Sequence, residues 1–166
     1  MIYVFLADGF EEIEALAPVD LLRRAGLTVQ TVGVTGKVVT GSHGIAVTAD
    51  ILPADLNLND ALQAVVLPGG MPGAKNLDAS AEVQAAIDFA AQNDKLVCAI
   101  CAAPFILGKK GMLSGKTATC FPGFEEQLTG AKVSADFVCR DGKFITAKGM
   151  GAAVEFGLAI VAADEI

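Results

Sequence analysis

The sequence is poor in the residues that bind metals or nucleic acids. Its 166 residues include one histidine, His43, so neither a zinc site nor a conventional Cys–His catalytic pair is easily built, and we expect no metal. Neighbouring basic residues occur only as Arg23–Arg24 and Lys109–Lys110, and the formal net charge is −7. Without a basic face, nucleic acid is not an expected partner.

Charge and long hydrophobic runs are also scarce. Charged residues make up 19% of the chain, hydrophobic residues 53%, and the mean hydropathy is +0.53. We expect one domain over residues 1–166, with a large core and a further apolar surface buried in a homodimer. The apolar runs are too short to cross a bilayer, and Met1 leads into a strand rather than a signal peptide. A cytoplasmic protein with four reduced cysteines is predicted.

Buried strands alternate with helices along the whole chain. Because the strands are continuous apolar runs, this alternation predicts a doubly wound, mostly parallel α/β sheet with helices on both faces. Strands are expected at 1–7, 27–34, 63–67, 96–100 and 117–120, and helices at 11–25, 81–92 and about 151–163. Small hairpins are expected near 38–47 and over 137–146.

The stretch from Leu96 to Pro104 carries the main candidate nucleophile. Leu96 to Ile100 fits a strand buried on both faces, and Pro104 indicates a helix that begins one or two residues before it. Cys101 would then lie where the strand turns directly into the helix. There, unpaired backbone N–H groups and the helix dipole favour a thiolate. A thiol that merely fills space is the competing interpretation.

Ligand groups in such sheets gather beyond the carboxyl ends of the strands, and three more segments end there. The first brings Glu11, Glu12 and Glu14; the first two fit simple helix-dipole complementarity. The second, Pro68 to Gly73, contains Gly69 and Gly70, which allow backbone N–H groups to approach an oxyanion. The third brings Cys120 and Phe121, where Cys120 either packs, lines the site or acts as a resolving thiol.

Glu14 borders the buried stripe of its helix, which distinguishes it from Glu11 and Glu12. A glutamate held close to a thiolate should be protonated, because burial and the neighbouring negative charge both raise its pKa. Glu14 and Cys101 would then form a coupled pair in which the carboxyl holds the proton that the thiol gives up.

Motifs spread over essentially the whole chain resemble the DJ-1/PfpI superfamily, in its DJ-1-like branch. They are Gly9-Phe-Glu-Glu-Ile-Glu14, Val65-Val-Leu-Pro-Gly-Gly70, Ala99-Ile-Cys-Ala-Ala-Pro104, and Gly149-Met-Gly151 leading into Glu155-Phe156. The resemblance implies a flavodoxin-like sandwich, a homodimer and chemistry without a cofactor. It matches Cys101 to an oxidisable nucleophile, Glu14 to its protonated partner, and Gly70 and Ala102 to an oxyanion-like pocket.

The resemblance also implies a choice of activities. They are the conversion of methylglyoxal to lactate, protein deglycation, redox sensing and chaperone-like protection, with a small aldehyde or an oxidant as partner. Peptidase activity is not expected, because Ala102 stands where the protease-like branch has a histidine. Relatives from animals have a histidine near Cys120–Phe121 and an arginine at His43, so all three residues are candidates for lining the pocket.

Two further interpretations stay open. Cys98-Ala99-Ile100-Cys101 has the spacing of a redox C-x-x-C motif, although a strand over 96–100 would hold the two sulfurs too far apart for a comfortable disulfide. A non-catalytic α/β binding module would instead give Cys101 ordinary thiol reactivity.

Overall fold

The computed structural model describes residues 1–164, which form a central sheet between two layers of helices. The described strands of this sheet follow the order β2-β1-β5-β6-β10-β9. All neighbours are parallel except β10 and β9, which form an antiparallel hairpin. The strands are β1 (Ile2–Leu6), β2 (Val29–Gly33), β5 (Ala64–Leu67), β6 (Leu96–Ile100), β9 (Val138–Asp141) and β10 (Phe144–Ala147). The predicted fold class is confirmed.

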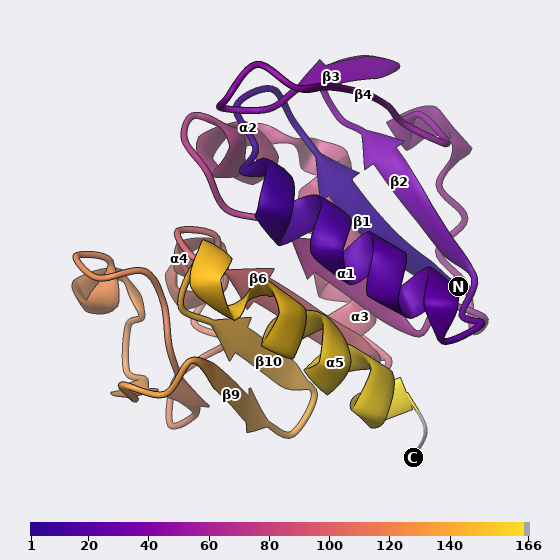
Figure 1. The fold of residues 1–166 in the computed structure, drawn as a ribbon. Coiled ribbons are helices and arrows are strands. Elements are labelled where there is room, and N and C mark those ends of the chain that lie inside the picture. The colour runs from indigo at the N-terminus through magenta and orange to yellow at the C-terminus, as the bar shows by residue number, and fades with distance from the viewer. Residues whose placement is uncertain (165–166) are drawn as a thin grey trace.

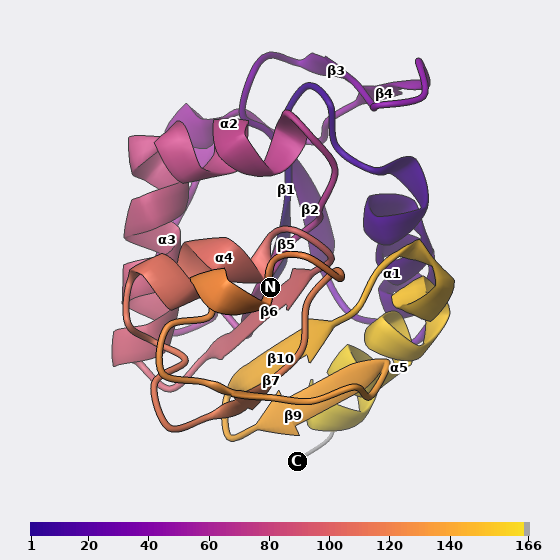
Figure 2. The same cartoon turned by 90° about the vertical axis from the view of Figure 1, so that its left-hand side faces the viewer.

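Each face of the sheet has its own apolar cluster, covered by its own helices (Figure 2). On one face lie α1 (Glu12–Arg24) and α5 (Ala153–Asp164), and on the other lie α2 (Gly73–Ala79), α3 (Ala81–Gln92) and α4 (Pro104–Lys109). Burial on both faces explains why the central strands read as continuous apolar runs. Helices α1 and α5 pack closely, since a Cβ on Gly157 would stand 2.8 Å from Cδ1 of Leu21.

Short strands and 3₁₀ turns lie outside the main sheet. Strands β3 (Val38–Thr40) and β4 (Ala46–Thr48) form the predicted hairpin near the carboxyl end of β1. Strands β7 (Thr117–Ala118) and β8 (Lys132–Val133) form a separate parallel pair. The 3₁₀ turns are η1 (Pro53–Asp55), η2 (Glu125–Gln127) and η3 (Met150–Ala152).

Most predicted elements are confirmed within one or two residues, including β6 and α3. Ser80 caps α3 as expected, its hydroxyl accepting a hydrogen bond from Val83 N at 3.3 Å.

Two predictions need correction. The sequence pattern does not predict helix α2, because its seven residues follow Pro72 and lack a side-chain cap. The strand expected at 117–120 is shorter and pairs with β8 outside the main sheet, so Cys120 and Phe121 follow a peripheral strand.

Candidate functional site

Cys101 lies directly after β6, in a backbone conformation with φ of 65°. Its N–H donates to the carbonyl of Ala147 at 2.8 Å, and its own carbonyl accepts from the N–H of Phe121 at 2.8 Å. A left-handed conformation is uncommon for a residue with a side chain and persists where surrounding contacts enforce it. Two segments distant in sequence therefore fix the backbone of the candidate nucleophile.

The helix after Cys101 begins later than the sequence predicts. Residues 101–103 form a turn, and α4 starts at Pro104 and ends at Lys109. Proline occupies the first helical position, where its missing N–H costs nothing. The helix therefore begins one or two residues later than expected, and a turn separates it from Cys101. A six-residue helix three positions away contributes little dipole to the sulfur.

Two backbone N–H groups, rather than the predicted helix terminus, favour the thiolate form of Cys101. The backbone N–H groups of Gly70 and Ala102 hydrogen-bond to the Cys101 sulfur and lower the pKa of its thiol. One amide comes from the loop after β5 and the other from the residue that follows the cysteine. The structure thus brings together the three residues expected at this point, with the two N–H groups directed at the sulfur itself.

Glu14 reaches the same point from the first turns of α1. Its side chain is fully buried, and neither carboxyl oxygen has a well-aligned hydrogen-bond partner among the described residues. A Cβ placed on Gly69 would stand 2.6 Å from Cys101 Cβ and 3.0 Å from Glu14 Oε1. The absence of a side chain at Gly69 therefore lets the carboxyl and the cysteine approach each other over this residue.

Burial raises the pKa of Glu14 to about 8, with a smaller increase from the charge of Glu11; a hydrogen bond with Cys101 acts in the opposite direction. Burial also raises the pKa of Cys101 to about 12, and the charge and hydrogen bond of Glu14 add to the increase. An unpartnered carboxylate in this position would be costly, so the carboxyl keeps its proton at neutral pH. Since a protonated Glu14 carries no charge, its repulsion of a thiolate disappears.

The glycine loop after β5 is tied to the start of α1. The carbonyl of Gly69 accepts a hydrogen bond from Glu11 N at 2.9 Å. Gly70 has φ of 91°, and a side chain there would collide with Glu11 N and the carbonyl of Gly9. The loop that supplies an amide to the sulfur is thus held against the helix that supplies the carboxyl.

Glu12 has a structural role that sequence reasoning missed. Its buried carboxylate accepts hydrogen bonds from the backbone N–H groups of His43 at 2.8 Å and Ile45 at 3.4 Å. A side chain at Gly41 would overlap this carboxylate. Glu12 thus holds the β3–β4 loop beside α1, which simple dipole complementarity did not predict. The only available signal was the glycine-rich spacing of residues 41–44.

His43 lies on the surface of this loop. Its Nδ1 is 3.2 Å from Glu12 Oε2 and 3.4 Å from Glu11 Oε2. Ligand atoms of these three residues lie within 4.8 Å of one another, close enough to hold a cation. Their existing hydrogen bonds already account for the arrangement, and His43 is 71% exposed in its side chain.

Cys120 and Phe121 take different positions. Cys120 packs into the apolar cluster beneath α2, α3 and α4, whereas Cys101 packs against the cluster on the other face. Burial raises the pKa of Cys120 to about 11, and its side chain borders a cavity of about 240 Å³ shared with Ser134 and Lys148. Phe121 instead borders a separate apolar cavity of about 200 Å³ that includes Met150. Sequence reasoning did not select Met150.

All four cysteines are free. Cys98 is fully buried within β6, and burial strongly raises the pKa of its thiol. Cys101 lies beyond the end of that strand, as the argument against a redox C-x-x-C motif requires.

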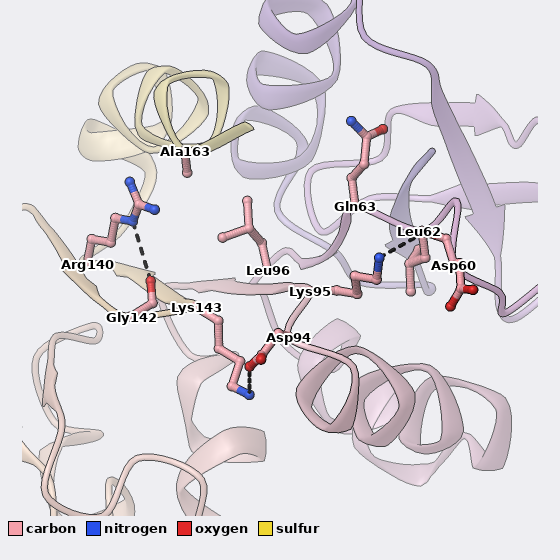
Figure 3. Close-up of a pocket in the computed structure, with 10 residues that line it drawn as sticks. All are labelled: Asp60, Leu62, Gln63, Asp94, Lys95, Leu96, Arg140, Gly142, Lys143 and Ala163. Atoms are coloured by element: carbon pink, nitrogen blue, oxygen red, sulfur yellow. Dashed lines mark hydrogen bonds and ion pairs between the residues drawn. The ribbon is translucent and has the colours of Figure 1, made fainter. Parts of the chain in front are cut away.

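Another cavity lies at the opposite edge of the sheet, where β5, β6 and β10 begin (Figure 3). Its volume is about 430 Å³, and charged side chains surround it. Lys143 Nζ is 2.8 Å from Asp94 Oδ1, and Lys95 Nζ donates to the carbonyl of Asp60 at 2.8 Å. These groups are paired and no cysteine lines the cavity, so its size alone does not make it the reactive site.

Within residues 1–164, no helix combines the length and apolar character needed to span a bilayer.

The fold and the site define a class: an α/β sandwich with a cysteine at the carboxyl edge of its sheet, paired with a buried glutamate. The model of the DJ-1/PfpI family matches residues 1–163, and the chain belongs to this family. It is 37% identical over 162 residues to the Parkinson disease protein 7 homolog of Danio rerio, covering 95% of this chain and 86% of that protein. A deglycase of Pyrococcus abyssi is 33% identical over 133 residues, and the match covers 80% of this chain and 78% of that protein.

The fold is similarly matched. The structure of oxidized DJ-1 from Toxoplasma gondii superposes with a TM-score of 0.92 at 35% identity. The match covers 98% of this chain and 89% of that chain.

Proposed function

We propose that this protein is a cofactor-free enzyme that converts small α-oxoaldehydes, such as methylglyoxal, to 2-hydroxy acids through Cys101. The observation that carries the proposal is the buried carboxyl of Glu14 next to that cysteine, with no other hydrogen-bond partner among the described residues. A carboxyl with a pKa near 8 can both donate and accept a proton near neutral pH, which is what an isomerisation requires.

The reaction begins with attack of the Cys101 thiolate on the aldehyde carbon. A C–S bond forms, the carbonyl π electrons move to oxygen, and Glu14 donates the proton that gives a hemithioacetal. The N–H groups of Gly70 and Ala102, which already point at the sulfur, stabilise the developing oxyanion.

Glu14, now a carboxylate, removes the proton from the former aldehyde carbon and returns it to the adjacent carbon, while the hydroxyl proton passes from the first oxygen to the neighbouring oxygen. The product of this step is a thioester with a hydroxyl group beside it. Water then hydrolyses the thioester, which releases the 2-hydroxy acid and restores the thiol. One aldehyde and one water thus give one acid, with no net oxidation and no cofactor.

A deglycase-type activity uses the same first intermediate. If an amine has already added to the aldehyde, attack by Cys101 forms the C–S bond as the C–N bond breaks, and Glu14 protonates the leaving amine. The deglycase from Pyrococcus abyssi supports this variant of the proposal. Release of amine faster than the spontaneous dissociation of the adduct would distinguish it from simple removal of free aldehyde.

The primary experiment measures methylglyoxal consumption without glutathione, with lactate identified as the product. The native protein is compared with Cys101→Ser and Glu14→Gln. Turnover in the native protein that disappears in both variants supports the proposal. Absence of turnover in the native protein overturns it.

Redox sensing by Cys101 is a second candidate function, because the similar Toxoplasma gondii structure is of an oxidized protein. One peroxide converts the thiolate to a sulfenate with release of water, and a second gives a sulfinate. The amides of Gly70 and Ala102 would then donate to the sulfinate oxygens. Selective oxidation of Cys101 over Cys98, Cys120 and Cys139 at low peroxide, in a protein without turnover, would favour this function.

We also propose a cytoplasmic homodimer that buries the outer faces of α1 and α5. Three apolar side chains stand about half exposed on these adjacent helices: Ile13, Val154 and Leu158. Light scattering should give a dimer mass for the native protein and a monomer mass for Leu158→Lys. A native monomer at micromolar concentration would contradict this assignment.

A further inference from the structure

The apolar cavity beside Cys101 has the properties of a pocket for a hydrophobic group. Its volume is about 200 Å³, and most of its lining comes from Phe121, Pro122, Phe137, Met150 and Ala152. Lys148 is its one charged lining residue, and the Lys148 ammonium donates to the carbonyl of Ala135 at 3.2 Å. Phe121, Phe137 and Met150 are each about half exposed, so the cavity is open to solvent.

Both segments that hold the Cys101 backbone continue into this cavity. The N–H of Phe121 bonds to the Cys101 carbonyl, and Phe121 lines the cavity. The carbonyl of Ala147 accepts the Cys101 N–H, and the cavity lining starts again at the next residue, Lys148. The cavity therefore adjoins the main chain of Cys101 through both of these segments.

The glycines in the lining keep the cavity open. A Cβ on Gly149 would stand 3.3 Å from Cδ2 of Phe121, so the ring packs tightly against the bare backbone. A Cβ on Gly151 would meet no atom within 4 Å, which leaves free space above that residue. An apolar cavity of roughly 150 Å³ is large enough to hold benzene, so the volume here accommodates a phenyl or branched alkyl group.

We infer that the protein selects α-oxoaldehydes with an aromatic or branched apolar substituent over methylglyoxal. The substituent occupies the cavity between Phe121 and Met150 while the aldehyde carbon meets Cys101. This inference rests on the proposed function and states which substrates that enzyme prefers. Methylglyoxal leaves the cavity unfilled, whereas a larger apolar group displaces water from its lining and gains hydrophobic free energy.

The test compares kcat/KM for methylglyoxal, 4-methyl-2-oxopentanal and phenylglyoxal. An extra methylene in a hydrophobic pocket typically gives about 10-fold or more, so both larger substrates should exceed methylglyoxal by roughly 10- to 100-fold. Gly151→Leu fills the open space and should reduce this ratio at least about tenfold. Ala85→Leu adds the same side chain to an exposed position of α3 and should leave the ratio unchanged. Equal kcat/KM values, or a ratio insensitive to Gly151→Leu, would overturn the inference.

A binding measurement tests the apolar cavity independently of the proposed reaction. If no aldehyde is consumed, the reaction fails, and the cavity is then tested with acetophenone and acetone, which share a methyl ketone. Ligand-observed NMR should show acetophenone bound at least about tenfold more tightly, and weakened by Gly151→Leu but not by Ala85→Leu. Equal affinities of the two ketones would overturn the selectivity for apolar substituents.

Discussion

At the two ends of the strands of the central sheet, called here the amino edge and the carboxyl edge, the pKa of a carboxyl group is shifted in opposite directions. At the amino edge, Asp94 is exposed, and the hydrogen bond and charge of Lys143 lower its pKa. At the carboxyl edge, Glu14 is buried without a cation, and burial raises its pKa to about 8. The cavity at the amino edge is about 430 Å³, against about 200 Å³ for the apolar cavity near Cys101, and Lys143 and Asp94 form an ion pair in it. The opposite pKa shifts therefore follow from desolvation at Glu14 and from the Lys143 partner at Asp94.

The largest expected effect is the loss of chemistry at the carboxyl edge in Cys101→Ser. Because a serine hydroxyl is a far weaker nucleophile than a thiolate, aldehyde turnover should fall by about a thousandfold or more. Lactate formation measures the effect. Cys139→Ser, which changes a thiol on β9, should retain activity; equal losses in the two variants would contradict the role of Cys101.

Glu14→Gln removes the proton carrier but keeps the size of the side chain. Turnover should fall by about 100- to 10,000-fold, which is the usual contribution of a general acid–base. In the native protein kcat/KM should rise with pH through about 8, as the Glu14–Cys101 pair loses its first proton, and the variant should lack this transition. Glu155→Gln is the control with an exposed carboxyl. A native pH profile that is flat from 6 to 9 would contradict the assignment.

The same carboxyl should make folding stability depend on pH. Between about 4.5 and 8 the unfolded chain releases the Glu14 proton while the folded protein keeps it, so the free energy of unfolding falls as pH rises. The contribution is fully present below 4.5, and its loss is complete above about 8. The slope is at most about 1.4 kcal/mol per pH unit. Urea unfolding of Glu14→Gln should show a weaker decline; an identical decline in both proteins would assign the dependence to other groups.

Gly69→Ala tests whether close approach creates the unusual environment. The added methyl group would stand 2.6 Å from Cys101 Cβ, so the loop or the cysteine must move. Overpacking of this kind costs about 1–3 kcal/mol, and displacement of the amides should also reduce activity. Thermal unfolding and turnover measure the two effects. Full activity with native stability would show that the site has more room than the structure indicates.

The smallest effect is expected at the amino edge. Asp94→Asn removes an exposed ion pair with Lys143, and such pairs typically contribute less than about 1 kcal/mol. Asparagine also tolerates the positive φ of 55° at this position. Chemical denaturation should detect little change, and aldehyde turnover should stay at the native level. A large loss of turnover would mean that the two edges are coupled.

The sequence contained enough information for the fold and for the central pair. Continuous apolar runs predict β1, β5 and β6, because strands buried on both faces need no alternation. The burial of Glu14 is as expected, but the predicted apolar stripe is wrong: Glu14 lies within the buried face of α1 beside Ala15, whereas its neighbour Ile13 is about half exposed. Residues that act through backbone geometry were harder to predict. The positive φ of Cys101 depends on Ala147 and Phe121, which are distant in sequence.

Other details depend on three-dimensional packing that local patterns do not encode. Cys120 and Phe121 are adjacent in sequence, yet one side chain joins the apolar cluster beneath α3 and the other borders the cavity with Met150. In the sequence Glu12 resembles an ordinary helix-terminal carboxylate, and only the structure shows that it binds the backbone of the β3–β4 loop. In both cases the determining contact comes from a segment about 30 residues away.

The hydrogen bonds on either side of Cys101 have a consequence for protein engineering. Because Ala147 and Phe121 hold residue 101 by its main chain, its position does not depend on the atom that its side chain carries. Selenocysteine at this position would keep the same backbone geometry while replacing the thiol with a more acidic selenol. The scaffold is therefore a suitable host for a different nucleophile, with the amides of Gly70 and Ala102 already in place to receive it.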